Sequence, residues 1–184
     1  MFFQIVRFHK PDEENGYMSN WYMKDFTVDG TTYNCVEQFM MAEKARVFQD
    51  IAIANQIMQV DDPQKMQDLG RLVSGFEPVI WDGRKQLIVY QAVYAKFDQN
   101  PELAGQLLST GTALPVECSR TDRVWGIGLG MDDPDAVNPH KWKGQNLLGF
   151  TLQAVRIELI RKYIRFAAEK LDNKTAQQFL QDKA

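Results

Sequence analysis

The longest regular pattern in the chain is an apolar stripe at helical spacing, which begins just after residue 146. Its members recur every three or four residues: Leu148, Leu152, Val155, Leu159, Tyr163 and Phe166. Because an α-helix turns by about 100° per residue, these side chains share one face, and the stripe predicts a helix over 146–171. The polar pair at 172–173 predicts a break, and residues 175–178 (TAQQ) resemble a capping box that would begin a short terminal helix.

The rest of the chain alternates between helical segments and short strands. Helices are expected in five places: 34–48, 50–60, from 63 onward, 81–97 (buried, with few solvent positions) and 100–111. Strands are expected in four places: 2–8, 26–28, 31–33 and 114–118. Asp62 can cap the helix that Pro63 opens, and the Asp29-Gly30 pair predicts a hairpin turn. Residues 119–145 carry few periodic signals and predict a long loop.

Helices dominate this pattern, so we predict an α+β fold, a predominantly helical single domain with a few short strands. We assign residues 1–170 to this domain and residues 171–184 to a short C-terminal helical extension. Hydrophobic residues make up 45% and charged residues 24% of the 184 residues, which is ordinary for a globular protein that buries a substantial core.

Charge and cysteine content narrow the functional classes. The formal net charge of −3 argues against binding to long nucleic acid duplexes, although it leaves a small nucleotide pocket possible. Cys35 and Cys118 fit neither a metal-ligand spacing nor a disulfide framework, which is typical of a reducing compartment. No targeting segment or membrane span is recognisable, so we expect a cytoplasmic protein that does not contact a membrane.

The segment 36–48 holds two charged residues on a face that should be buried. At helical geometry Glu37 and Lys44 fall within about 60° of each other, among methionines and valines. They are two turns, about 10 Å, apart, which is too far for a one-turn ion pair. Burying an unpaired charge costs several kcal/mol, on the order of the stability of a whole domain. Buried charged groups are therefore usually paired, neutralised or used in function. Either each pairs with a charge elsewhere in the fold, or both enter one pocket.

A glycine-rich segment over 117–130 offers a second candidate site. Its glycines could let backbone amides approach a phosphate or ribose, or could simply form a loop. The spacing is wrong for a dinucleotide fingerprint. Trp125 could stack on a base or belong to the core, and Asp122 could present a carboxylate to that ligand or stabilise a turn.

A third cluster covers residues 138–149. Asn146 stands where an N-cap belongs, and the exposed amides of that helix start would also suit an anion. His140 has only His9 as a possible histidine partner, at no metal-ligand spacing, so we predict no metal and no cofactor. Neither a nucleophile elbow nor a phosphate-binding P-loop is present in the sequence.

Several ordered motifs together resemble the YbiA-like NADAR family. They are residues 16–21 (GYMSNW), 37–45 (EQFMMAEKA), Trp81 before the helix that ends at 97, 107–111 (LLSTG), Ser119 with Asp122, 125–128 (WGIG) and 142–149 (WKGQNLLG). The match covers about residues 5–165. One departure is the stretch 129–141, which some members lack and which resembles another branch of the family.

The resemblance implies an α+β fold without metal and hydrolysis of N-glycosidic bonds. Family members act on ribosylamino-pyrimidine phosphates, which are intermediates of riboflavin biosynthesis, and others remove ADP-ribose from guanine. By motif position, the active-site residues are Glu37, Trp81, Asp122 and Trp125, with Lys44 as the family's helix lysine. A small ribose-phosphate N-glycoside is the first substrate class expected. The alternatives are an ADP-ribosyl hydrolase, for which nucleic acid is a substrate only through a modified base, and a catalytically silent ADP-ribose-binding module.

These expectations give each residue a role in N-glycosidic cleavage. Glu37 is expected to face the anomeric carbon as a carboxylate, and Asp122 to assist as an acid or contact ribose hydroxyls. Lys44 either forms a Schiff base with a ring-opened sugar or, as we slightly favour, binds phosphate or fixes Glu37. The expected substrate-binding residues are Asn20, Trp21, Trp81, Trp125, Gly126, Gly128 and Asn146.

Overall fold

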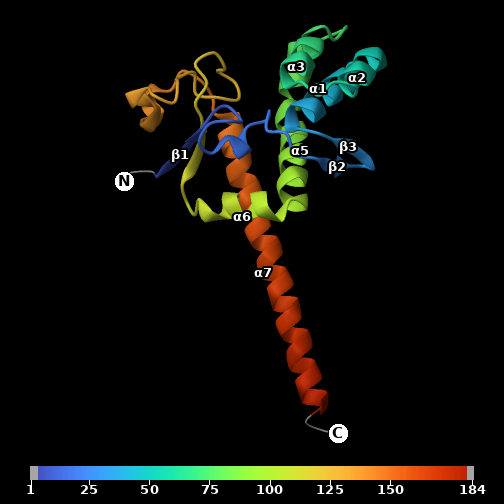
Figure 1. Ribbon diagram of the computed structural model, residues 1–184, viewed down its shortest axis with the longest axis vertical. Helices are drawn as coiled ribbons and strands as arrows, with labels where there is room; N and C mark the ends of the chain where they lie inside the picture. Colours follow the sequence, from blue (N-terminus) through green and yellow to red (C-terminus); the bar gives the residue numbers. More distant parts are fainter. Residues whose placement is uncertain (1–3, 182–184) are drawn as a thin grey trace.

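The computed structural model describes residues 4–181 of the chain (Figure 1). Its elements follow the order β1 (Ile5–Phe8), η1 (Gly16–Met18), β2 (Phe26–Val28), β3 (Thr31–Tyr33), α1 (Val36–Val47), α2 (Ile51–Ile57), α3 (Pro63–Arg71), α4 (Pro78–Asp82), α5 (Lys85–Gln99), α6 (Pro101–Ser109), β4 (Leu114–Glu117), η2 (Pro134–Val137), η3 (Pro139–Lys141) and α7 (Leu147–Gln181). The predicted α+β class is confirmed. Residues 2–3 of the predicted first strand and residues 182–184 of the predicted extension lie outside the described residues.

Two pairs of short strands flank the helices. β1 and β4 run parallel, with Phe8 opposite Glu117 at their carboxyl ends, so the segments after both strands leave the sheet side by side. β2 and β3 form the predicted hairpin. Asp29 (φ 49°) and Gly30 (φ 78°) both lie in the left-handed region that the two-residue turn of a twisted hairpin requires.

Helices α1, α5 and α7 form the centre of the molecule. α1 packs against α2, α3 and α5, while α7 packs against α5, α6 and β4 (Figure 1). The core that they share includes the fully or almost fully buried side chains Phe8, Val36, Phe39, Ala42, Val89, Val93, Leu107, Leu152 and Leu159. α1 is buried on most of its circumference, because α2, α3 and α5 all pack against it.

The single buried helix predicted over 81–97 is wrong in two respects. α4 ends at Asp82 and α5 begins at Lys85, with Gly83 at the end of the first helix. Glycine has low helix propensity, so it favours a new start at this point. The outer face of α5 is also open to solvent, since Leu87 is 74% exposed.

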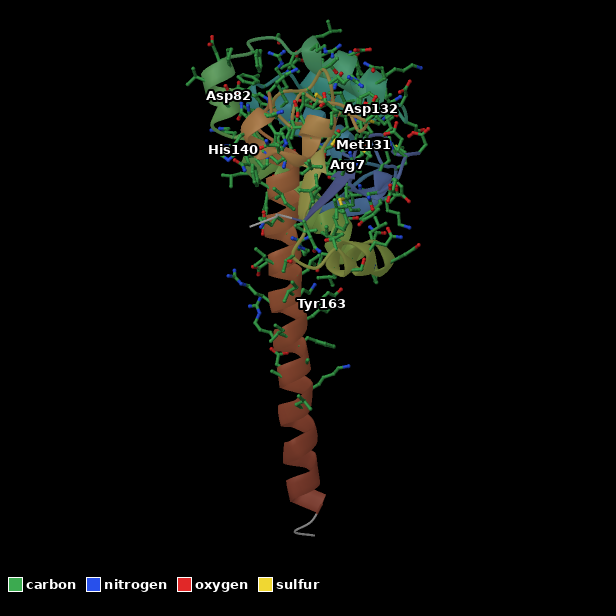
Figure 2. All side chains as sticks on the ribbon, turned by 90° about the vertical axis from the view of Figure 1, so that its left-hand side faces the viewer. Arg7, Asp82, Met131, Asp132, His140 and Tyr163 are labelled. Carbon is green, nitrogen blue, oxygen red and sulfur yellow. The ribbon has the colours of Figure 1, made fainter. Side chains whose placement is uncertain are left out.

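Helix α7 divides into a packed half and a projecting half. Leu148, Leu152, Val155 and Leu159 are buried, whereas Tyr163 and Phe166 of the same stripe are 42% and 54% exposed. Beyond about residue 160 the helix extends away from the body, as the position of Tyr163 in Figure 2 shows. No helix within residues 4–181 combines the length and hydropathy needed to cross a bilayer.

The predicted break at 172–173 and the separate terminal helix are wrong, because α7 continues through this point to Gln181. Asp172 and Asn173 each cost only up to about 0.7 kcal/mol in a helix interior. Without a glycine or proline, that cost is too small to end a helix already propagated for six turns.

Candidate functional site

A cavity of about 850 Å³ lies where α1 and α3 face the ends of β1 and β4. Six of the predicted site residues line it: Asn20, Trp21, Glu37, Lys44, Asp122 and Trp125. The charged residues of its remaining lining are His9, Lys10, Asp12, Arg71 and Glu117. The structure therefore brings chemistry-bearing side chains from four separate parts of the chain around one space.

Glu37 supplies the most buried carboxyl group of this cavity. It lies in the first turn of α1, where its backbone amide donates to Asn20 O (3.0 Å). Its side chain is 2% exposed, and Oε1 has no hydrogen-bond partner among the described residues. Burial raises the pKa of Glu37 to about 8, and the Asp122 charge adds to the rise, while Trp21 and Gln67 oppose it through hydrogen bonds. A pKa this high favours the protonated form of Glu37 at neutral pH.

Lys44 lies two turns further along α1 and lines the same cavity. Nζ donates to Gly70 O (2.7 Å) and sits 4.3 Å from the ring centroid of Phe76. A Cβ at Gly70 would overlap the Met41 sulfur, so α3 packs closely on the Met41 side chain of α1 at this point. Burial lowers the pKa of the Lys44 ammonium, whereas the Glu37 carboxylate raises it. Of the two alternatives drawn from the sequence, the shared pocket matches this arrangement.

Asp122 is held in a turn at the opposite wall. Its Oδ1 accepts hydrogen bonds from the amides of Val124 (2.8 Å) and Trp125 (2.9 Å), and its own amide donates to Ser119 Oγ (3.2 Å). The turn role considered for this residue is thus present, and the side chain lines the cavity as well. The same turn fixes Trp125, whose indole forms part of the cavity wall.

Asn20 and Trp21 reach the cavity from the loop between η1 and β2. A buried lysine of α5 supports this loop, because Lys96 Nζ donates to Tyr17 O (2.9 Å) and Ser19 O (3.1 Å). Burial lowers the pKa of Lys96 to about 7. Asn20 is 6% exposed, and its Oδ1 has no partner among the described residues, which leaves an acceptor available to a ligand.

The other four predicted substrate-binding residues lie outside the lining that the structure describes. The Trp81 ring, in α4, lies 6.0 Å from Lys44 Nζ. Gly126 and Gly128 serve backbone packing, since a Cβ at Gly126 would lie 2.9 Å from Glu117 O and Gly128 has a φ of 70°. Asn146 is fully buried, with a φ of 53°.

The predicted N-cap role of Asn146 is wrong. Its Oδ1 accepts from the Glu117 amide (3.0 Å), and its Nδ2 donates to Pro115 O (3.0 Å), so the side chain ties the start of α7 to strand β4. The left-handed backbone at this residue turns its side chain toward the strand instead of the first turn of α7.

Sequence reasoning missed several charged or polar lining residues. Glu117 could have been found, because it is a lone carboxylate at the end of an apolar strand whose neighbours Val116 and Cys118 are buried. Gln67 and Arg71 lie one turn apart on α3, where the Arg71 guanidinium binds Gln67 Oε1 (2.7 Å). That spacing is also typical of a solvent-exposed helix face, so it does not by itself indicate that the two residues line a cavity. His9 follows β1, and only the parallel pairing of β1 with β4 brings it here.

Comparisons with known proteins agree with this architecture. The family model of the NADAR domain matches residues 7–160. N-glycosidase R617 of Acanthamoeba polyphaga mimivirus is 43% identical over 126 residues, which are 68% of this chain and 74% of that protein. Riboflavin biosynthesis protein VVA0006 of Vibrio vulnificus is 31% identical over 156 residues, 85% of this chain but 39% of that longer protein. The NMR structure of the E. coli protein YbiA is similar with a TM-score of 0.74, at 29% identity over 89% of both chains.

Proposed function

Because the chain belongs to the NADAR family and is a hydrolase of N-glycosyl compounds, we propose that its substrate is a ribosylamino-pyrimidine phosphate or a closely related ribose-phosphate N-glycoside. The observation that carries this proposal is the buried Glu37 carboxyl group, which shares one cavity with Asp122 and two indole rings. The similarity to a protein named for riboflavin biosynthesis supports this substrate class.

The chemistry needs two groups of opposite character. As the C1–N bond breaks, positive charge builds on the anomeric carbon, and the departing nitrogen takes the electron pair. An acid that protonates the nitrogen and an anion that faces the carbon both lower the barrier. A buried carboxyl group of raised pKa suits the first task, and a carboxylate fixed by hydrogen bonds suits the second.

We therefore assign the acid role to Glu37 and the anion role to Asp122. This exchanges the roles expected from the sequence, and the reason is burial: the Glu37 pKa of about 8 leaves it a proton to donate at neutral pH. Asp122 Oδ1 accepts hydrogen bonds from two backbone amides. An ionised carboxylate offers only acceptor oxygens, so this bonding suits the anion role. Loss of the proton from Glu37 would abolish the reaction, so activity should fall as pH rises through 8.

Lys44 acts in this proposal by binding and positioning, not as a nucleophile. Its Nζ is held by Gly70 O and lies over aromatic rings, which leaves N–H groups to meet a substrate phosphate or the Glu37 carboxyl. Borohydride treatment during turnover, followed by mass spectrometry, tests this role. An adduct on Lys44 would contradict it, and an unmodified Lys44 peptide is the expected result.

Some of the remaining predicted residues are proposed to contact the substrate, and the others to support the cavity walls. We propose that Trp21 and Trp125 hold the base by stacking and that the free Oδ1 of Asn20 accepts from a sugar hydroxyl. Trp81, Gly126, Gly128 and Asn146 would act through the walls that they hold in place. The predicted division into a domain over 1–170 and an extension over 171–184 stands as part of the proposal.

A second candidate function is removal of ADP-ribose from guanine. It is favoured by a further cavity of about 460 Å³ that shares His9, Lys10, Ser119 and Thr121 with the first and could receive the distal part of a longer substrate. A silent ADP-ribose-binding module is the third candidate, and the presence of Glu37 and Asp122 in one cavity argues against it.

Hydrolysis assays separate these functions. Wild type should release the base from a ribosylamino-pyrimidine phosphate, and Glu37→Gln should lower kcat by about 10³-fold. Glu43→Gln is the matched control, a carboxylate of the same helix that pairs with Arg46 and lies outside the cavity lining, and it should keep full activity. Faster turnover of ADP-ribosylated guanosine would favour the second function. Binding of both compounds without turnover would leave only the silent module.

A further inference from the structure

A histidine–carboxylate pair lines the same cavity as Glu37 and Lys44 of α1. The parallel register places Phe8 opposite Glu117, so His9 follows directly beside this strand end. His9 Nδ1 lies 2.8 Å from Glu117 Oε1. The Glu117 side chain is only 9% exposed, whereas the His9 side chain is 32% exposed, and both line the main cavity. A buried carboxylate thus meets an imidazole that remains open to the substrate space.

The backbone holds Glu117 in this orientation. Its amide donates to Asn146 Oδ1 (3.0 Å), and its carbonyl accepts from the Ile127 amide (2.9 Å). A Cβ at Gly126 would lie 3.2 Å from Glu117 Cγ, so the segment packs directly against the side chain. Next to the pair, Arg7 donates to Met131 O (2.7 Å) and ties β1 to the loop after this segment (Figure 2).

The pair leaves one ring nitrogen of His9 available. Nδ1 is engaged by Glu117, and Nε2 has no hydrogen-bond partner among residues 4–181. A carboxylate that accepts from Nδ1–H fixes the tautomer whose Nε2 carries a lone pair, which is the arrangement of a general base. The exposed side of the imidazole can therefore take a proton from a bound molecule.

Asp122 interacts electrostatically both with this pair and with Glu37. The Asp122 charge raises the pKa of both Glu37 and Glu117, so its carboxylate lies within electrostatic reach of the two buried glutamates. A sugar bound in this cavity would be surrounded by Glu37, Asp122 and His9, which all line it. Departure of a base and entry of water need two groups of this kind, an acid for the leaving nitrogen and a base for the water.

We propose that His9 is a further catalytic residue, the general base that activates the hydrolytic water, and that Glu117 is its positioning residue. The inference rests on the proposed function. In the step, His9 Nε2 takes a proton from water while the water oxygen forms the C1–O bond. The C1–N electron pair goes to the leaving nitrogen, which takes its proton from Glu37. Solvent then returns a proton to Glu37 and removes one from His9.

The charged groups around His9 set the pH at which it can act. Glu117 of β4 and Glu13 of the following turn raise its pKa above 6.5, and Lys10 opposes them. Asp12 and Asp122 also line the cavity. Since a base must be unprotonated, activity should fall as pH drops below the raised His9 pKa. The full profile should be bell-shaped, with its alkaline limb from Glu37 near pH 8.

NMR titration tests the pair without relying on catalysis. The chain has two histidines, so His140→Gln, a change at an exposed residue outside both cavities, leaves His9 as the sole imidazole signal. We expect His9 to titrate above 6.5, and Glu117→Gln to lower that pKa. A His9 pKa at or below 6.5, unchanged by Glu117→Gln, would overturn the pairing.

Kinetics then test the catalytic role. His9→Gln should lower kcat by about 10²-fold or more, leave KM nearly unchanged and remove the acidic limb of the pH profile. Glu117→Gln should move that limb to lower pH. If His9→Gln is as active as His140→Gln while Glu37→Gln is inactive, His9 is not the base and the proposed function stands. Full activity of Glu37→Gln would instead overturn the proposed function.

Discussion

The two walls of the cavity are built by different means. On one wall, Glu37 and Lys44 project from a regular helix whose own backbone bonds fix them in place. On the other, Glu117 ends strand β4, and Asp122 and Trp125 stand on the following segment, which has little regular structure. Long-range backbone bonds position that segment: Ile127 to Glu117, Gly128 to Asp122, Lys143 to Ile127 and Gln145 to Arg123.

This difference determines how each wall should respond to substitution. A change on α1 alters the chemistry of one side chain and leaves the helix intact, since its neighbours still pack. A change in residues 117–146 can move several groups together, because Gly126, Gly128 and Gly144 lie where two stretches of backbone touch. Shifts of about 1 Å cost up to about 100-fold in rate when they misplace catalytic groups.

A combined loss of stability and activity is expected from Gly144→Ala. The added Cβ would overlap the Gly126 carbonyl oxygen, which is backbone and cannot swing away as a side chain would. We expect a loss of about 1–3 kcal/mol in the free energy of unfolding and a rate loss of about 100-fold. Denaturant unfolding and steady-state assays measure the two effects.

Gly105→Ala provides the control for this comparison. No described atom lies within 4 Å of a Cβ at Gly105, which is inside α6, so alanine should raise stability there by about 0.5–1 kcal/mol. If Gly144→Ala and Gly105→Ala had the same free energy of unfolding and the same rate, contacts between loop backbones would not be what holds the second wall.

A pH-dependent effect on stability, confined to the helical wall, is expected from the titration of Glu37. Burial raises its pKa from 4.5 to about 8, so the folded protein keeps a proton that the unfolded chain releases between these values. The free energy of unfolding should therefore fall as pH rises from 4.5 through 8, by up to about 1.4 kcal/mol per pH unit. Glu37→Gln should remove this slope, and parallel curves of stability against pH for wild type and variant would contradict it.

The smallest effect is expected from removing the projecting end of α7. Residues 161–170 are exposed, so a chain that stops after residue 170 should keep its activity within about twofold, as an exposed surface change does. Stopping after residue 155 should instead prevent folding. That variant loses the buried Leu159 and the Arg156 bond to Ala113 O (2.8 Å). A large activity loss on the first truncation would contradict the division at residue 170.

Much of the helical wall could be predicted from the sequence. Helical periodicity placed Glu37 among buried positions, and the Asp29-Gly30 turn and the Asp62 cap follow from local chemistry alone. Local signals also have limits, as α7 shows: Asp172 and Asn173 resemble a helix stop, but propagation of an established helix outweighs their low propensity.

The second wall could not be predicted in the same way. His9 and Glu117 are 108 positions apart, and only the pairing of β1 with β4 brings them together. Asn146 has the residue type and position of an N-cap, yet a left-handed backbone turns its side chain to β4. Such placements depend on tertiary contacts that no short window of sequence contains.

The most direct test of the site is a crystal structure of Glu37→Gln with an intact ribosylamino-pyrimidine phosphate. We predict that the glycosidic nitrogen lies within hydrogen-bond reach of the residue 37 amide, with the base against Trp125 and the anomeric carbon facing Asp122. A substrate bound away from residue 37, or one whose sugar contacts neither Asp122 nor Trp125, would contradict the assignment of this cavity as the place of cleavage.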